Sequence, residues 1–131
     1  MILRSGVDLI EINRMAGLNP RIRARFLARV FTPAELDNCH NANASLSGRF
    51  AAKEAVAKAL GTGIGPIRWQ EIEICDGPQG EPVLQLHGAA HQLADQLGLD
   101  TWSVSISHTA THAVAMAVAL GKNRQSKAGQ R

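Results

Sequence analysis

The chain has 131 residues and 45% of them are hydrophobic, which is enough for one compact domain with a core and too little for two. Aromatic residues account for only 4% and tyrosine is absent, so a base-stacking surface for single-stranded nucleic acid would be hard to assemble. The net charge of +3 and the pI near 9.3 favour an anionic partner, and leave open whether that partner is nucleic acid, a nucleotide or an acidic protein.

Cysteine usage and apolar run lengths bear on the compartment. Cys39 and Cys75 lack CxxC spacing, and no signal-peptide pattern opens the chain, so we expect a cytoplasmic protein with reduced and unreactive thiols. No apolar run approaches the length of a membrane span, so no membrane partner is expected.

Hydrophobic periodicity and turn residues divide the chain into short elements, and no internal repeat is visible. Gly6, inside the first strand, indicates a bulge or a close backbone approach. Thr32, Pro33 and Glu35 are typical of a helix start, and Gly61 is suited to ending the long helix. In chain order we expect a strand at 2–9, helical residues at 11–15, a helix at 21–30, a helix starting at 33, a loop at 38–45, a long helix at 46–60, strands at 70–75 and 82–87, a helix at 87–97 closed by Gly98, and strands at 102–108 and 113–120.

These elements do not follow a strict strand, helix, strand rhythm. We therefore expect an α+β fold, a single compact domain in which a mostly antiparallel sheet packs against a long helix. The domain is expected to span residues 1–120. Residues 121–131 are polar and basic without periodicity, and we expect a disordered tail there.

The long helix carries two charges where a packed helix normally carries hydrocarbon. Glu54 and Lys58 lie one turn apart, on an arc that they share with Phe50, Ala51 and Ala57. A surface ion pair, adding about 0.2–0.5 kcal/mol to the helix, is the plain interpretation of such spacing. The case for a functional pair depends on a second unusual residue, Asp8.

Asp8 is a carboxylate in a strand whose neighbours, Val7, Leu9 and Ile10, favour burial. A single aspartate in this position is more often a hydrogen-bonded cap than a ligand. Together with Glu54, however, it could bind Mg²⁺, which takes one or two protein carboxylates and completes its shell with water and phosphate oxygens. Such a site implies a phosphate substrate, and Lys58 would stand within reach of it as a point charge.

Two further segments are candidates for phosphate contacts. Residues 61–65 form a glycine-rich loop, but the loop follows a helix instead of preceding one, so a helix end is the better interpretation. His108 ends an alternating strand beside Ser105, Ser107 and Thr109, a polar cluster that could bind a phosphate or relay a proton. A structural histidine is about as consistent with this pattern.

Three stretches then carry a family resemblance: GVDLIEINR from Gly6 to Arg14, RFAAKEAVAKALGTGIG from Arg49 to Gly65, and VSISHT from Val104 to Thr109. Together they resemble the holo-acyl-carrier-protein synthase family of phosphopantetheinyl transferases, with matching order and spacing throughout residues 2–120. The resemblance implies Mg²⁺-dependent transfer of the 4′-phosphopantetheine arm of coenzyme A to a serine of apo acyl carrier protein. It also implies a role in fatty acid or lipid biosynthesis, and a homotrimer with active sites at the subunit interfaces.

The resemblance also assigns roles to residues of this sequence. Asp8 and Glu54 would bind the metal, and the catalytic residues would be Glu54, Lys58 and His108. The general base stays open, since a metal-bound water, Glu54 or His108 could each serve. The residues implied to contact coenzyme A are Arg49, Lys53, Lys58, Gly63, Ser107, His108 and Thr109. A neighbouring subunit could contribute His108, Ser107 and Thr109.

The arginine-rich helix at 21–30 suits docking of the acidic carrier protein. Its apolar side is expected to combine Ile22 and Phe26 with Leu27 or Val30, and its arginines recur at i,i+4 spacing on another side. A merely soluble face is the alternative. The residues expected to dock the carrier are Arg14, Arg21, Arg25, Phe26 and Arg29.

Two other classes of protein remain in competition with the transferase. A metal-dependent nuclease also combines acidic residues with a lysine, but it usually places them as E-x-K on a strand, whereas Glu54 and Lys58 are four apart on a helix. A non-enzymatic nucleic-acid-binding module would need no metal and would use the arginine helix and the basic tail. We expect no nucleic acid partner.

Overall fold

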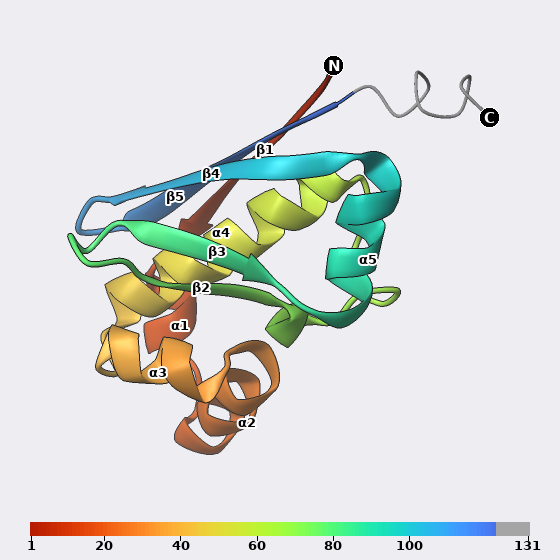
Figure 1. Ribbon diagram of the computed structural model, residues 1–131. Helices are drawn as coiled ribbons and strands as arrows, with labels where there is room; N and C mark the ends of the chain where they lie inside the picture. Colours follow the sequence, from red (N-terminus) through yellow and green to blue (C-terminus); the bar gives the residue numbers. More distant parts are fainter. Residues whose placement is uncertain (123–131) are drawn as a thin grey trace.

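The computed structural model describes residues 1–122. The sheets are antiparallel, and in the sequence most of the helices follow the first strand and precede the second, as expected for an α+β domain (Figure 1). The elements are β1 Ile2–Glu11, α1 Asn13–Ala16, α2 Pro20–Val30, α3 Pro33–Cys39, α4 Asn43–Leu60, the 3-10 helix η1 Trp69–Glu71, β2 Ile72–Asp76, β3 Pro82–Leu86, α5 Gly88–Leu97, β4 Leu99–His108 and β5 His112–Gly121.

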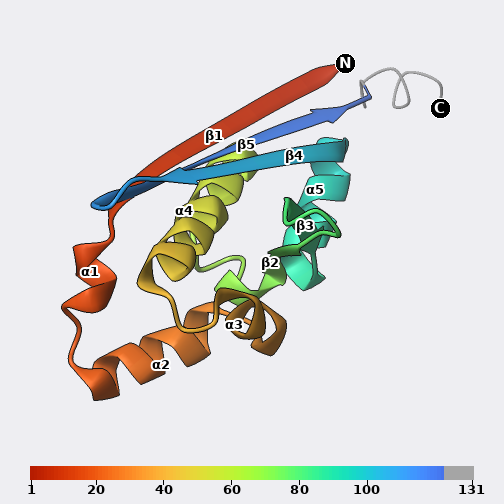
Figure 2. The same cartoon turned by 90° about the vertical axis from the view of Figure 1, so that its left-hand side faces the viewer.

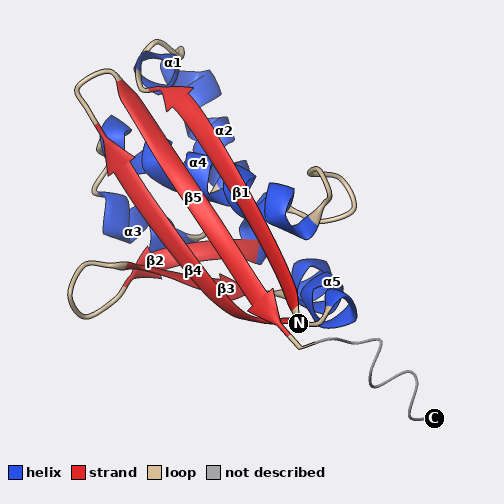
Figure 3. Cartoon of the chain, turned by 90° about the horizontal axis from the view of Figure 1, so that it is seen from above, coloured by secondary structure: helices blue, strands red, loops and turns tan. Residues whose placement is uncertain are grey.

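The main sheet has three strands in the order β1-β5-β4, and both pairs are antiparallel. Figure 2 shows these strands as an upper layer, with α4 directly beneath them and α2 and α3 farther below. The opposite face of the sheet is turned to the viewer in Figure 3, and no described helix covers it. The β2–β3 hairpin is a separate two-stranded sheet. The predicted fold, a mostly antiparallel sheet packed against a long helix, is confirmed.

The sheet and α4 approach closely because small residues line the contact. Every second residue of β5 from Ala113 to Ala119 is a buried alanine. On β1, a Cβ added to Gly6 would lie 1.9 Å from the carbonyl oxygen of Ala55 in α4. Gly6 therefore marks a close backbone approach, as its place in a strand predicted.

The predicted helix ends are also present. Thr32 caps α3 in a capping box, in which the Thr32 side chain accepts from the N–H of Glu35 and the Glu35 carboxylate accepts from the N–H of Thr32. Gly61 ends α4 in the left-handed conformation, with φ 77°. Arg4 of β1 reaches the same end of α4 and donates from Nε to the carbonyl oxygen of Ala59 at 3.0 Å.

Two expectations were wrong. The predicted loop at 38–45 is only a short link, because α3 continues to Cys39 and α4 already begins at Asn43; His40 and Asn41 turn the chain with positive φ values. Ile22 is 51% exposed, so it does not share the packed side of α2 with the buried Val30. The predicted tail at 121–131 lies, from residue 123 onward, outside the described residues.

Candidate active site

Asp8, Glu54 and Lys58 come together where the edge strand β1 crosses α4. Asp8 lies on the inner face of β1, in step with Gly6 and the buried Ile10. Lys58 Nζ donates to the carbonyl oxygen of Val7 at 2.8 Å and to Asp8 Oδ1 at 3.4 Å. The strand therefore holds both the carboxylate and the ammonium group at one place on the surface of the helix.

Glu54 is half-buried beside this pair. Burial raises the pKa of its carboxyl group, the negative charge of Asp8 raises it further, and Lys58 partly opposes both effects. Within residues 1–122, no hydrogen bond or ion pair involves the Glu54 carboxylate. Two neighbouring carboxylates with so few donors are suited to holding a cation.

The chemistry of this donor set fits Mg²⁺ in particular. No group of three or more histidine, cysteine, aspartate or glutamate side chains that could hold a metal occurs within the described part of the chain. A closed site supplied by protein ligands alone is thus not formed by these residues. Mg²⁺ instead needs only one or two carboxylates, because water and substrate phosphate oxygens complete its octahedron. Asp8 and Glu54 meet that requirement.

Arg49 and His108 line a cavity of about 170 Å³ between α4, the hairpin and β4. His108 is the last residue of β4, and Ser107 before it points to the opposite face of the strand. Thr109 belongs to the tight turn into β5, where its N–H donates to the carbonyl oxygen of His112. The other residues lining the cavity are Ala44, Ser45, Gly48, Asp76, Gly80, Pro82 and Ile106.

The two groups lie on opposite sides of α4. Arg49 precedes Glu54 by five residues, which places it about 140° around the helix axis. Asp8 and His108 are likewise on the two outer strands, with β5 between them. One chain therefore brings Asp8, Glu54 and Lys58 together and brings Arg49 and His108 together, but it keeps the two groups apart.

The family model of the 4′-phosphopantetheinyl transferase superfamily matches residues 4–118 of the chain. The chain belongs to this superfamily.

Relatives that span nearly the whole chain share one name, holo-[acyl-carrier-protein] synthase. The protein from Moorella thermoacetica is 50% identical over 131 residues, covering 98% of this chain and 100% of that protein. The protein from Herpetosiphon aurantiacus is 47% identical over 127 residues, covering 92% and 100%. Among solved structures, the Helicobacter pylori enzyme in complex with coenzyme A superposes with a TM-score of 0.80 at 33% identity, covering 88% of this chain and 99% of that one.

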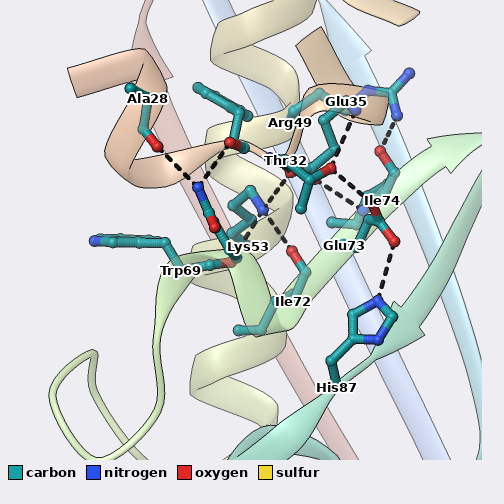
Figure 4. A network of polar contacts seen from close by, with 12 residues as sticks. Ala28, Thr32, Glu35, Arg49, Lys53, Trp69, Ile72, Glu73, Ile74 and His87 are labelled. Carbon is teal, nitrogen blue, oxygen red and sulfur yellow. Dashed lines mark hydrogen bonds and ion pairs between the residues drawn. The ribbon is translucent and has the colours of Figure 1, made fainter. Parts of the chain in front are cut away.

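Lys53, which was expected to contact coenzyme A, lies in the interior of the protein. Its side chain is fully buried and is paired with the equally buried Glu35 (Figure 4). The expected contact between Lys53 and coenzyme A is therefore wrong for this structure, since no surface of the ammonium group is available to a ligand. Sequence reasoning assigned Glu35 only to the start of α3 and missed this partner 18 residues away, because nothing local marks a tertiary ion pair.

The expected docking residues lie at or near α2 and are accessible. Arg21, Arg25 and Arg29 are exposed on this helix. Arg23 of the same helix has a different role, since its guanidinium donates to Asn41 Oδ1 at 2.7 Å and to Asn43 Oδ1 at 2.8 Å. A cavity of about 150 Å³ adjoins the helix and is lined by Ile10, Arg14, Met15, Leu18, Phe26 and Phe50.

The remaining expected residue, Gly63, is exposed, and a side chain added there would meet no atom within 4 Å. Sequence reasoning also missed Asp76, which pairs with the Arg49 guanidinium in the cavity that Arg49 and His108 line. The only signal for it was a turn sequence in the hairpin.

None of the helices in residues 1–122 is long and apolar enough to cross a bilayer.

Proposed function

We propose that this chain is a holo-[acyl-carrier-protein] synthase. It transfers 4′-phosphopantetheine from coenzyme A to a serine hydroxyl of apo acyl carrier protein and releases adenosine 3′,5′-bisphosphate. The observation that supports this most directly is the grouping of Asp8, Glu54 and Lys58 in a chain whose relatives carry that name. We place the enzyme in the cytoplasm and in fatty acid biosynthesis.

Asp8 and Glu54 are the residues that would hold Mg²⁺, which when bound neutralises charge on the coenzyme A pyrophosphate. Lys58 is already oriented by the carbonyl oxygen of Val7 and by Asp8, so its third proton can be directed at a phosphate oxygen. As the bond between the transferred phosphorus and the leaving oxygen breaks, negative charge grows on the leaving group. A fixed ammonium group beside it stabilises that charge more than the charge of the starting pyrophosphate.

The nucleotide half of the site is assigned to Arg49 and His108, with Ser107, Thr109 and Gly63 as further contacts. Because this half lies on the far side of α4 from Glu54, a complete site requires a second copy of the chain. The uncovered face of the main sheet supports such an assembly, since apolar side chains of β1 and β5 gather there. The exposed ones are Leu3, Val7, Leu9, Met116 and Leu120. We assign the assembly as a homotrimer.

Arg14, Arg21, Arg25 and Arg29, with Phe26 as an apolar anchor, are proposed to dock the acidic carrier protein. A reversed charge, as in Arg25→Glu, should raise the KM for the carrier about tenfold, and more at low salt, because exposed charges act mainly on encounter. Arg23→Glu is not a suitable control, because Arg23 holds the link before α4. Lys122→Glu, at the far end of β5, should leave this KM unchanged.

The direct test is to incubate the protein with coenzyme A, Mg²⁺ and apo acyl carrier protein and to weigh the carrier by mass spectrometry. We expect the carrier to gain the mass of one phosphopantetheine. No gain with any native carrier would refute the proposed activity. Cleavage of DNA under the same conditions would favour a metal-dependent nuclease instead.

A further inference from the structure

Lys53 makes three contacts inside the protein, and these connect separate elements (Figure 4). Its Nζ donates to Glu35 Oε1 at 2.8 Å, to the carbonyl oxygen of Trp69 at 3.0 Å and to the carbonyl oxygen of Ile72 at 2.5 Å. An ammonium group has three protons, so these contacts use all of them. The side chain therefore has one defined direction from α4 toward η1 and β2.

Glu35 is equally well held. Its Oε1 accepts from the N–H of Thr32 as well as from Lys53, and its Oε2 accepts from the N–H of Ile74 at 2.9 Å. The ion pair thus joins α3, α4, η1 and β2. One turn earlier on α4, the Arg49 guanidinium donates to the carbonyl oxygen of Ile74. Lys53 and Arg49 therefore lie on the same side of α4, and both donate hydrogen bonds to carbonyl oxygens of β2.

The face of α4 that packs against the sheet consists mainly of small side chains. Toward the sheet and core it presents mainly buried alanines, which are Ala51, Ala52, Ala55, Ala57 and Ala59. Alanine side chains form shallow ridges, so they specify the rotation of a helix less sharply than longer side chains do. The azimuth of α4, its rotation about its own axis, is therefore held on the side of β2 by Lys53 and Arg49 and on the side of β1 by the contacts of Arg4 and Lys58.

Azimuth matters because α4 carries parts of both halves of the site. Glu54 directly follows Lys53, and Lys58 lies one turn beyond it. On a helix whose side chains reach about 6 Å from the axis, a rotation of about 20° moves a side-chain tip by about 2 Å. Catalytic groups need positions accurate to about 0.5 Å, and an error of about 1 Å can lower a rate 100-fold.

We infer that Lys53, held by Glu35, is a positioning residue that fixes the azimuth of α4 and so places Glu54 and Lys58 against Asp8. Its link to catalysis rests on the proposed function. Both side chains of the ion pair are fully buried, so we expect its effect on binding of the carrier protein to be small.

The test uses the double variant Lys53→Met/Glu35→Gln in the full chain. The single variant Lys53→Met leaves a buried carboxylate without its partner, and we expect it to unfold at a clearly lower urea concentration than the wild type. The double variant removes both charges and keeps their approximate shape, so part of the lost stability should return; the rest stays lost because the glutamine amide can accept from only one of the Thr32 and Ile74 N–H groups. We expect its kcat to remain at least tenfold below that of the wild type, with the KM for the carrier unchanged within about twofold.

A second measurement does not depend on activity. Residual dipolar couplings of backbone amides report the orientation of α4 relative to β1 and β5, and we expect those of α4 alone to change in the double variant. A stability control is Leu93→Ala in α5, whose side chain packs against the core; α5 supplies no hydrogen-bond partner to Lys53 or Glu35. This variant should lower stability and leave kcat and the α4 couplings unaltered.

A stable double variant with wild-type couplings and a kcat within about twofold of the wild type would overturn the inference. Failure of the wild type to modify any carrier would instead refute the proposed function. In that case the couplings alone would still decide whether Lys53 fixes the azimuth of α4.

Discussion

Glu54 carries a charge that the described residues around it do little to compensate. Burial and the Asp8 carboxylate raise its pKa. The folded protein therefore holds ionised Glu54 at a cost, which sets in as pH rises above the ordinary glutamate pKa of 4.5 and is complete above the raised value in the folded state. A bound cation would remove this cost, whereas a structural ion pair would show the opposite sign.

Glu54→Gln should separate these two cases. Without divalent cations at pH 7, we expect the variant to unfold at a higher urea concentration than the wild type, because the costly charge is gone. The difference should vanish in acid, where Glu54 is protonated in both states. Transfer activity should fall about 100-fold or more. Asp37→Asn, which removes an exposed charge from α3, should alter neither quantity; loss of stability in Glu54→Gln at pH 7 would indicate a structural pair.

Gly6 determines how closely β1 can approach α4. Gly6→Ala would place a methyl group 1.9 Å from the backbone carbonyl oxygen of Ala55, so strand or helix must shift. We expect a loss of about 2 kcal/mol or more in the free energy of unfolding, and a drop in activity because Asp8 moves with the strand. Chemical denaturation checks this. Gly63→Ala, with no atom within 4 Å, should change stability by less than about 0.5 kcal/mol.

Among the elements, the start of α3 is tied to the hairpin by Glu73. The Thr32 hydroxyl donates to Glu73 Oε2 at 2.6 Å, and His87 Nε2 lies 3.0 Å from Oε1. The hydrogen bond from Thr32 lowers the pKa of Glu73 most, His87 lowers it further, and burial opposes both. This stabilisation is present above the ordinary glutamate pKa and is lost as pH falls through the lowered value.

Glu73→Gln should therefore reduce the free energy of unfolding at pH 7 by about 1 kcal/mol, since one charge-assisted hydrogen bond becomes a neutral one. The two proteins should converge as the pH is lowered below about 4. Urea denaturation at several pH values measures this. Glu81→Gln in the hairpin turn provides a comparison, and a constant difference between wild type and Glu73→Gln at every pH would contradict the expectation.

Elements with local signals could be predicted from the sequence. Alternation marked β1 and β4, a continuous apolar run marked β5, and Thr32 and Gly61 marked helix ends that the structure confirms. The start of α4 could not be predicted, because His40 and Asn41 adopt left-handed conformations without the glycine that usually marks such a turn. Ile22 fits an apolar periodicity that tertiary packing does not use.

The candidate site was predictable to a similar extent. Asp8, Glu54 and Lys58 are unusual in their local sequence, and the structure brings them together. Lys53 looked equally available, but its burial depends on Glu35, which approaches it only in the folded chain. That Arg49 and His108 lie apart from Glu54 follows from the helix period and from the strand order, and the strand order cannot be derived from spacing along the chain.

At the scale of the whole molecule, the apolar face of the main sheet should control both assembly and activity. Val7 and Met116 lie directly opposite each other on neighbouring strands of this face. Val7→Asp should convert a species of three times 14.0 kDa into a monomer, as measured by sedimentation, with little loss of fold because Val7 is exposed in the single chain. Activity should be lost with the assembly. Gln92→Asp on α5 should remain trimeric, and a monomeric wild type would contradict the proposal.

A site shared between copies also predicts complementation. Glu54→Gln and His108→Ala proteins should each be nearly inactive alone. After they are unfolded together in equal amounts and refolded, about a quarter of the interfaces should combine an intact Glu54 with an intact His108. We expect activity to recover toward that fraction of the wild-type value. No recovery in mixed assemblies, verified by mass spectrometry, would place the whole site within one chain.

The strand order also has a consequence for biosynthesis. β1 carries Asp8, and its only described strand neighbour is β5, with Ile2 beside Gly121. On the ribosome, β1 must therefore remain unpaired until residues 112–121 have emerged. The carboxylate pair and the apolar face are both incomplete until then. Until β5 has been synthesised, neither the proposed site nor the proposed subunit interface can therefore form.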